Sequence, residues 1–380
     1  MKIVFTGGGT GGHFYPLMAV ADEINHKSKT EKLLRPELIY IGPFVLDQEA
    51  LIQRHISFAQ ASAGKKRKYF SIQNFFDYFK TAWGIIQATW QLYKIFPDVV
   101  FSKGGYAAFP TTVAARFLGI PLVIHESDAH PGKANVIASK WAKLIAISYP
   151  EVIKYFPEKI DRDKFILTGN PVRPELFKPV REGAHEFLEL DPSIPTILVL
   201  GGSSGAKAVN DVLLDALPSL VEKYQIIHQT GSNLLDETQA IAKVKLKNSK
   251  HADRYKAFGY LSTFALRMAF GISSLVVSRA GSGAIFEIAA VSLPSILIPI
   301  PEDVSHDQTD NAFAYAKTGA AVVIKQKNLT ATILENEIDR IMNNPKLWQE
   351  MSGAAKNFAK PDAAKKIAEI LMKIALEHEK

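Results

Sequence analysis

The 380-residue sequence contains no cysteine. This absence excludes disulfide bonds, a thiolate nucleophile and cysteine-ligated zinc, and it favours a reducing compartment such as the cytoplasm. Long apolar runs are also missing, because Arg279 and Glu287 interrupt the longest candidate, and a spanning helix needs roughly 18 apolar residues. The first residues show no basic leader before an apolar core, so no secretion signal is expected. We therefore expect a protein that meets a membrane only at its surface.

Charge and length narrow the class further. Lys and Arg outnumber Asp and Glu by 45 to 38, which gives a formal charge of +7 and favours anionic partners. Phosphates, acidic lipid head groups and nucleic acid all fit, but no nucleic-acid-binding module is recognisable, so we expect no nucleic acid partner. A chain of this length, 47% hydrophobic, is expected to form two domains of roughly 100 to 200 residues.

Short apolar runs alternate with longer helical patterns, which is typical of parallel sheets covered by helices. The stretch TGNPVRPELFKP, 168–179, is rich in turn formers and indicates a linker. We predict an N-terminal domain over 1–168, a second domain over 169–360 and a C-terminal helix over 361–380 that packs back, with Ile367, Leu371 and Ile374 on its apolar face. The predicted strands are 3–6, 38–41, 99–102, 122–125, 144–147 and 165–168, then 196–200, 225–229, 275–278, 295–298 and 321–323.

Glycine-rich turns follow the first strand of each predicted domain. IVFTGGGTGGHFYP, 3–16, contains G-x-G-x-x-G, but the next strand ends LIYIGP without the carboxylate of a dinucleotide site, and no Gly-Lys-Ser/Thr marks a P-loop. What remains is a nest of backbone amides at a helix N-terminus, suited to a diphosphate. ILVLGGSSGA, 197–206, repeats the pattern, so both loops are expected at the carboxyl ends of strands, facing a shared cleft.

His13 stands at the mouth of the first loop. A neutral imidazole there can accept a proton from an attacking hydroxyl at physiological pH. A histidine that only hydrogen-bonds the loop explains the same residue, and both interpretations stay open.

Six motifs, in order along essentially the whole chain, carry a family resemblance: GGGTGGHFYP (7–16), SKGGYAAFP (102–110), HESDAHPGKAN (125–135), GNPVRPE (169–175), GGSSGAKAVN (201–210) and SRAGSGAIFEIAAVSLPSILIPIP (278–301). Together they resemble the MurG family, the UDP-N-acetylglucosamine:N-acetylmuramyl-(pentapeptide) pyrophosphoryl-undecaprenol N-acetylglucosamine transferases of glycosyltransferase family 28. The resemblance implies the α/β GT-B fold, two Rossmann-like domains with parallel sheets facing a central cleft. It implies inverting transfer of GlcNAc from UDP-GlcNAc to the C4 hydroxyl of the muramoyl sugar of lipid I, giving lipid II for peptidoglycan. It implies no cofactor and no required metal, and a peripheral place on the cytoplasmic face of the cell membrane.

The resemblance also implies roles for particular residues. Glu287 is the expected ribose ligand, Arg173 reaches the pyrophosphate from the linker, and Gln308 and Asn311 hold the transferred sugar. The candidate catalytic groups are His13, Asp128 and Glu126; the further donor-binding candidates are Thr10, Gly11, Gly12, Ser203, Gly205, Ala206, Arg279 and Gly281; the acceptor-binding candidates are Gly8, Gly9, Gly104, Gly105 and Tyr106.

Two departures from the family pattern affect these roles. The family's consecutive glutamines are replaced around Gln308 by Asp307 and Thr309, and Asp128 stands where some members carry Asn. Asp128 could orient either His13 or the acceptor hydroxyl. Ordinary strand-end hydrogen bonding explains Glu126 equally well. The uracil pocket is expected within 258–268, with no residue assigned.

An anionic membrane surface is the expected partner of a basic and aromatic segment. KKRKYF, 65–70, supplies Lys65, Lys66, Arg67, Lys68 and Phe70, and Phe75 and Phe76 follow. Basic residues near an anionic leaflet each contribute about 1 kcal/mol, and aromatic rings enter the interface. The stripe from Trp83 to Tyr93 is interpreted as core packing of a sheet-covering helix. Asp161 to Asp163, DRD, is interpreted as solvated surface rather than a metal triad.

Three functions from different classes stay open on the sequence alone. The first is the lipid-linked GlcNAc transferase. The second is another GT-B enzyme, either a diacylglycerol glucosyltransferase or a UDP-GlcNAc 2-epimerase. The third is a catalytically silent protein that binds a nucleotide sugar or an anionic lipid, which the presence of His13 and Glu287 disfavours.

Overall fold

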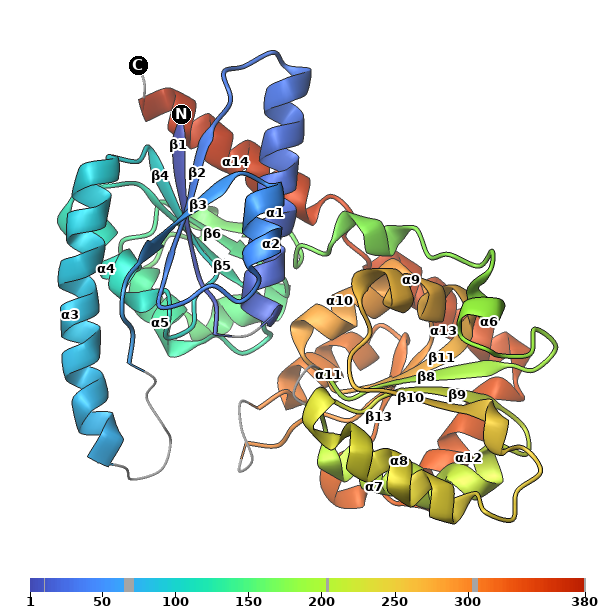
Figure 1. Ribbon diagram of the computed structural model, residues 1–380. Coiled ribbons are helices and arrows are strands. Elements are labelled where there is room, and N and C mark those ends of the chain that lie inside the picture. Colours follow the sequence, from blue (N-terminus) through green and yellow to red (C-terminus); the bar gives the residue numbers. More distant parts are fainter. Residues whose placement is uncertain (10, 65–71, 203–204, 303–306, 379–380) are drawn as a thin grey trace. The chain divides into compact units, whose positions relative to one another are not determined.

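The computed structural model describes residues 1–9, 11–64, 72–202, 205–302 and 307–378 (Figure 1). The chain divides into two compact units: unit 1 comprises Met1–Arg173 and Lys360–Lys380, and unit 2 comprises Pro174–Ala359. Each unit contains one parallel sheet covered by helices, which confirms the predicted α/β class with two parallel sheets. The first crossing between units follows Arg173, five residues beyond the boundary predicted after residue 168.

Unit 1 is built on a seven-stranded sheet in the order β3-β2-β1-β4-β5-β6-β7, parallel throughout. Its strands are β1 (Lys2–Thr6), β2 (Glu37–Gly42), β3 (Ile56–Gln60), β4 (Val99–Ser102), β5 (Leu122–Glu126), β6 (Leu144–Ile147) and β7 (Phe165–Leu167). Its helices are α1 (Gly11–Thr30), α2 (Gln48–Gln53), α3 (Ile72–Ile95), α4 (Phe109–Phe117), α5 (Lys133–Ala138) and α14 (Ala363–His378).

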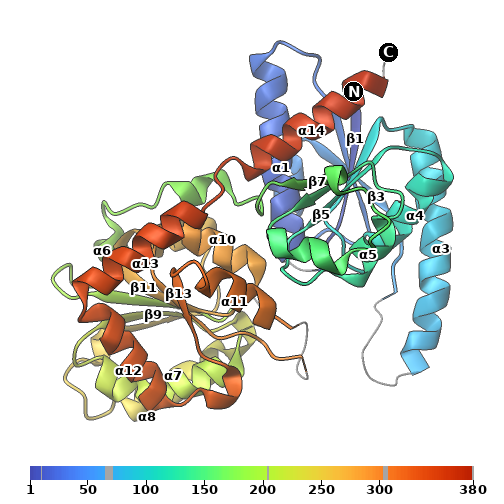
Figure 2. The same cartoon turned by 180° about the vertical axis from the view of Figure 1, so that it is seen from behind.

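Two apolar clusters cover the two faces of this sheet. One joins β1 to α1 and α14, and Ile367, Leu371 and Ile374 of α14 are buried in it. The other joins the sheet to α3, α4 and α5. Central strands of a parallel sheet are buried on both faces, which is why the three consecutive residues Ile3, Val4 and Phe5 of β1 are all apolar. Figure 2 shows α14 lying beside α1 on unit 1, although the two helices are separated by the whole of unit 2 in sequence.

Unit 2 repeats the plan with six parallel strands in the order β10-β9-β8-β11-β12-β13. Its strands are β8 (Thr196–Leu200), β9 (Gln225–Gln229), β10 (Tyr255–Phe258), β11 (Ser273–Ser278), β12 (Ser295–Leu297) and β13 (Ala321–Val323). Its helices are α6 (Ala184–Phe187), α7 (Lys207–Leu220), α8 (Leu235–Lys245), α9 (Thr263–Ile272), α10 (Ser282–Ala290), α11 (Thr309–Ala316), α12 (Ala331–Met342) and α13 (Pro345–Phe358).

The long helix α3 corrects one prediction. Phe75, Phe76, Phe79, Trp83, Ile86, Trp90 and Tyr93 are all 57 to 65% exposed, and we call them the α3 aromatic face. The helix packs through its opposite side instead, where Ala88 and Leu92 are buried and Gly84 lies against Ser62 and Pro110. Small side chains permit close approach to α4, so the large rings point away from the sheet. Core packing from Trp83 onward is therefore wrong, and Figure 1 shows α3 on the outside of unit 1.

Candidate active site

In each unit a glycine loop lies where the strand order reverses direction. β1 connects onward to β2 on one side, whereas β4 connects onward to β5 on the other, so the switch point of unit 1 lies between β1 and β4. The corresponding pair in unit 2 is β8 and β11. Ligands of such sheets bind beyond the carboxyl ends of the strands at this point. These four strand ends lead into the four glycine motifs that the sequence predicts as sites.

The loop after β1 is shaped for backbone contact with an anion. Gly7, Gly8 and Gly9 have φ values of 152°, 124° and 94°. A side chain on Gly8 would place its Cβ 2.5 Å from the hydroxyl of buried Tyr40, which donates a hydrogen bond to the Gly7 carbonyl. Helix α1 starts at Gly11, and its first-turn amides have no partner within the helix. Gly11 and Gly12 thus lie in the helix start that suits a phosphate; Thr10 lies outside the described residues.

The loop after β4 lies against the first loop. Gly104 and Gly105 have φ values of 77° and 78°. An added Cβ on Gly105 would come within 3.5 Å of His13 Nε2, and one on Gly9 within 2.9 Å of the Tyr106 ring. The structure therefore brings His13 and the predicted acceptor-binding residues together at one edge of unit 1, with His13 half-buried in the first turn of α1.

The Glu126 carboxylate is buried and accepts hydrogen bonds from the segment that follows β5. Its Oε1 accepts the Asp128 amide at 3.0 Å, and its Oε2 accepts the Gly132 amide at 3.0 Å and Asn135 Nδ2 at 2.9 Å. Burial, then the neighbouring Asp128 charge, raises the pKa of Glu126 to about 7. With three donors and 3% exposure it cannot reach an acceptor hydroxyl, so we infer a structural role for Glu126. His13 and half-buried Asp128 are the catalytic candidates with access to solvent.

Two residues of this edge were not predicted as site residues. Asn135 donates to the His125 carbonyl at 3.0 Å and to Glu126, and its Oδ1 lies against Gly104. Lys103, 1% exposed, directs its amine at His125 Nδ1 and Asn170 Oδ1. Both stand inside motifs that the sequence analysis quoted, but only the fold shows that their side chains turn inward.

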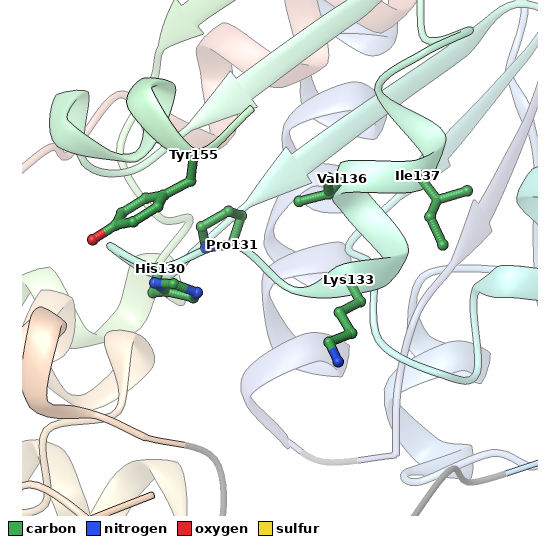
Figure 3. A pocket seen from close by; sticks show the side chains of 6 residues that line it. All are labelled: His130, Pro131, Lys133, Val136, Ile137 and Tyr155. Atoms are coloured by element: carbon green, nitrogen blue, oxygen red, sulfur yellow. The ribbon is translucent and has the colours of Figure 1, made fainter. Parts of the chain in front are cut away.

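Beside the loop that carries Asp128, unit 1 has a pocket of about 370 Å³ (Figure 3). The His130 and Tyr155 rings lie 4.4 Å apart on one wall, and the Lys133 amine supplies a positive charge. Its lining is His130, Pro131, Lys133, Val136, Ile137 and Tyr155. An apolar wall with one ammonium group suits an amphipathic anionic group.

In unit 2 the loop after β8 folds tightly against the end of β9. The Gly201 amide donates to the Gln229 carbonyl at 3.0 Å, and Gly202 and Gly205 have φ values of 79° and 77°. Ala206 is the residue before α7, so the loop again ends at a helix N-terminus. Ser203 lies outside the described residues, as do Lys65, Lys66, Arg67, Lys68 and Phe70 of the predicted membrane segment.

The loop after β11 gathers the remaining donor candidates. Gln308 Oε1 accepts the amides of Ala280 at 3.0 Å and Ile300 at 3.2 Å, and Asn311 Nδ2 donates to the Ala280 carbonyl at 3.3 Å. These hydrogen bonds hold both sugar-binding candidates against the turn that ends at Gly281, the N-cap residue of α10.

Arg279, Glu287 and Arg173 complete the set of donor candidates. Arg279 Nη1 donates to the Ile298 carbonyl at 3.2 Å, and burial lowers the pKa of Arg279. Glu287 is the sixth residue of α10 and is half-buried. The Arg173 guanidinium lies 5.1 Å from the ring centre of Tyr15, on unit 1.

Within the described residues, no three His, Asp or Glu side chains gather as a metal site, and no helix is long and apolar enough to span a membrane.

Comparison with known proteins agrees with this geometry. The Glycosyltransferase family 28 N-terminal domain matches residues 3–147, and the Glycosyltransferase family 28 C-terminal domain matches residues 196–367. A UDP-N-acetylglucosamine--N-acetylmuramyl-(pentapeptide) pyrophosphoryl-undecaprenol N-acetylglucosamine transferase of Treponema denticola is 36% identical, covering 95% of this chain and 93% of its own. One of the same name from Clostridium novyi is 34% identical, covering 94% and 95%.

Solved structures give the same picture. Acinetobacter baumannii MurG superposes with a TM-score of 0.74 at 26% identity, covering 98% of this chain and 99% of its own. UDP-GlcNAc 2-epimerase from Neisseria meningitidis shares the fold at 14% identity, with a TM-score of 0.68 over 98% of this chain and 100% of its own. With both halves matched and 36% identity over nearly the full length, the chain belongs to glycosyltransferase family 28, in the family of UDP-N-acetylglucosamine--N-acetylmuramyl-(pentapeptide) pyrophosphoryl-undecaprenol N-acetylglucosamine transferases.

Proposed function

We propose that this protein transfers GlcNAc from UDP-GlcNAc to the C4 hydroxyl of the muramoyl sugar of lipid I, with inversion, to give lipid II. The observation that carries the proposal is the juxtaposition in unit 1 of a phosphate-shaped glycine loop, a second glycine loop and the His13 imidazole between them. An acceptor held by its pyrophosphate in such a loop presents its sugar to a base at the loop mouth. The names of the relatives agree with this acceptor and donor.

Inversion at the anomeric carbon is a single displacement, so it needs one base and a stabilised leaving group. His13, as a neutral imidazole, takes the proton of the attacking hydroxyl, and Asp128 orients either His13 or that hydroxyl. Gly8, Gly9, Gly104, Gly105 and Tyr106 form the acceptor side. Because the transition state builds charge on the departing diphosphate, preorganised amides there lower the barrier without reorganisation.

Unit 2 is proposed as the donor side. The Gly205 amide donates to the Gly202 carbonyl at 3.2 Å and so fixes the loop. The Ala206 amide, Ser203 and Arg279 neutralise the diphosphate, and Arg173, the last residue of the first segment of unit 1, is proposed as a further cation for it. The Glu287 carboxylate accepts hydrogen bonds from the ribose hydroxyls. Gln308 is half-buried and fixed to the backbone at Ala280, so the amide group that it directs to the sugar is preorganised. Asn311 is 2% exposed and donates to the Ala280 carbonyl, so it supports this turn from inside the protein. Gly281 is the N-cap residue of α10, the helix that carries Glu287, so the proposed sugar and ribose contacts are attached to the same helix.

The α3 aromatic face is proposed to meet an anionic membrane surface. Seven large side chains on one helix, each more than half exposed, form an apolar surface that water solvates poorly. Lys80 and Lys94 lie on the same helix, and the basic segment 65–68 precedes it. This arrangement, apolar rings beside cations, is typical of peripheral binding to an acidic leaflet, and it would bring unit 1 to a lipid-borne acceptor.

The deciding experiment measures UDP release from UDP-GlcNAc with and without a lipid I analogue, and identifies the product by mass. Acceptor-dependent release with a product one GlcNAc heavier supports the proposal. Formation of UDP-N-acetylmannosamine, or of N-acetylmannosamine and UDP by hydrolysis, would indicate a 2-epimerase instead. UDP-GlcNAc binding without any turnover would indicate a silent binding protein.

A further inference from the structure

We propose that Lys103 is a positioning residue of the acceptor half: its buried ammonium joins three loops and balances the charge of the carboxylates at Glu126 and Asp128. The inference rests on the proposed assignment of unit 1 to the acceptor. Fully buried lysines are rare unless they are paired, so the residue calls for a specific partner set.

The main chain of Lys103 already joins the two glycine loops. Its amide donates to the carbonyl of Thr6, the last residue of β1, at 2.9 Å. A Cβ added to Gly7 would lie 3.0 Å from the Lys103 Cβ, so the two residues are in close contact. The residue after it is Gly104, the first glycine of the second loop. Any shift of Lys103 therefore moves both loops that we assign to the acceptor pyrophosphate.

The side chain extends this connection to two further strand ends. Lys103 Nζ lies 2.7 Å from His125 Nδ1, at the end of β5, and 2.9 Å from Asn170 Oδ1, beyond β7. Because an ammonium group can only donate, Nδ1 accepts and the His125 proton resides on Nε2, which donates to the Gly169 carbonyl at 2.9 Å. Gly169 and Asn170 belong to the segment that leads to Arg173, where the chain leaves unit 1.

Charge explains why this connector is a lysine. The titratable groups that face it are His125 and Glu126 of β5, Asp128 of the following loop and, beyond His125, His13 of α1. Two carboxylates in a buried loop repel each other, and a cation beside them compensates this repulsion. Burial lowers the pKa of Lys103 to about 7, against the opposing pull of Glu126 and Asp128. Its ammonium form therefore predominates below neutral pH and is lost as the pH rises through about 7.

Lys103→Met keeps the side chain unbranched, shortens it by one atom and removes its charge, and a double-mutant cycle with Asp128→Asn measures the coupling between the two charges. We expect Lys103→Met alone to lower kcat/KM for the lipid I analogue by about 100-fold, since a misplacement of about 1 Å costs that much. In the Asp128→Asn background the same change should lower it by less than about 10-fold. The Kd for UDP-GlcNAc, measured by calorimetry, should stay within about twofold of wild type throughout. Equal losses in both backgrounds, or a weakened Kd, would overturn the proposal.

Asn170→Asp tests the same role without changing Lys103, and it leaves the shape of the side chain at position 170 nearly the same. A carboxylate beside Nζ holds the ammonium form to higher pH, so the basic limb of kcat/KM for the acceptor should move up by about one pH unit or more. An unmoved basic limb would refute the role of the charge even if Lys103→Met does not fold. If wild-type protein transfers no sugar at all, the proposed function fails. The placement of Lys103 is then read from ¹⁵N NMR of His125, whose Nε2 tautomer with a hydrogen-bonded Nδ1 is expected, and an Nδ1-protonated ring would contradict it.

Discussion

Alanine at Gly205 should weaken UDP-GlcNAc binding far more than alanine at Gly202, although the two glycines have nearly the same backbone conformation. Their φ values are 77° and 79°, a region in which a side chain costs roughly 1 kcal/mol. A Cβ on Gly202 meets nothing within 4 Å. A Cβ on Gly205 falls inside the contact distance of the Thr230 carbonyl and comes within 2.9 Å of Leu234 Cδ1. An added side chain is strained by the positive φ at both positions, but it collides with backbone atoms only at Gly205.

The size of the two effects follows from these contacts. The roughly 1 kcal/mol at Gly202 lowers affinity by about fivefold at most. Since carbon atoms pack at about 3.5 to 4.0 Å, Gly205→Ala has to move the loop by about 1 Å. A displacement of that size at a phosphate cradle costs about 100-fold, or about 2.7 kcal/mol.

Calorimetry with UDP-GlcNAc measures both constants, and thermal unfolding checks that unit 2 is intact. Gly353→Ala is the matched control, because it lies in helix α13 with nothing within 4 Å of its Cβ, and it should bind as wild type does. Wild-type affinity in Gly205→Ala would refute the assignment of this loop to the diphosphate. Equal losses in Gly202→Ala and Gly205→Ala would refute the steric part of the reasoning.

Four further outcomes are expected. His13→Ala should lower kcat by about 10² to 10⁴ while the Kd for UDP-GlcNAc is kept; unchanged turnover in a coupled UDP-release assay removes His13 as base. Glu287→Ala should weaken the affinity for UDP by about 5- to 150-fold, because hydrogen bonds to the ribose are lost. An unchanged affinity for UDP, measured by calorimetry, would argue against that contact. Burial lowers the pKa of His228 to about 3, so its contribution to the free energy of unfolding is present above pH 6.5 and is lost as the pH falls toward 3. This contribution is about 5 kcal/mol, and urea titrations of His228→Gln should show a smaller loss of stability in acid. Replacing Trp83 and Trp90 by Ser should reduce binding to anionic vesicles without lowering the unfolding temperature. A lower unfolding temperature would indicate that the two side chains pack against the folded protein.

Eleven strands were predicted from apolar runs, and the structure adds β3 and β10. Both lie at a sheet edge, β3 with most of its side chains exposed and β10 with all of them half-buried. A strand with one open edge need not be apolar on both faces, so ISFAQ and YKAF give no unbroken apolar run. The edge strands β7 and β13 could be predicted because FIL and AVV remain apolar.

The site shows the same division. The loops at Gly8 and Gly205 could be predicted, because several glycines close together in the sequence indicate a loop with positive φ. The burial of the Lys103 and Asn135 side chains could not be predicted, since a lysine after a strand and an asparagine in the first turn of a helix are usually solvated. The exposure of Trp83 was missed for the opposite reason: helical spacing shows that residues share a face but not which side of the helix meets the sheet.

Helix α14 has a consequence for how the protein is made. It completes the apolar cluster on one face of the unit 1 sheet, yet it is synthesised after all of unit 2. Unit 2, contained in one continuous segment, can fold while the ribosome is still working, whereas the apolar surface of α1, β1 and β4 that α14 contacts stays uncovered until α14 is made. The order of synthesis and the order of folding are therefore reversed, and the nascent N-terminal half is the part that most needs a chaperone.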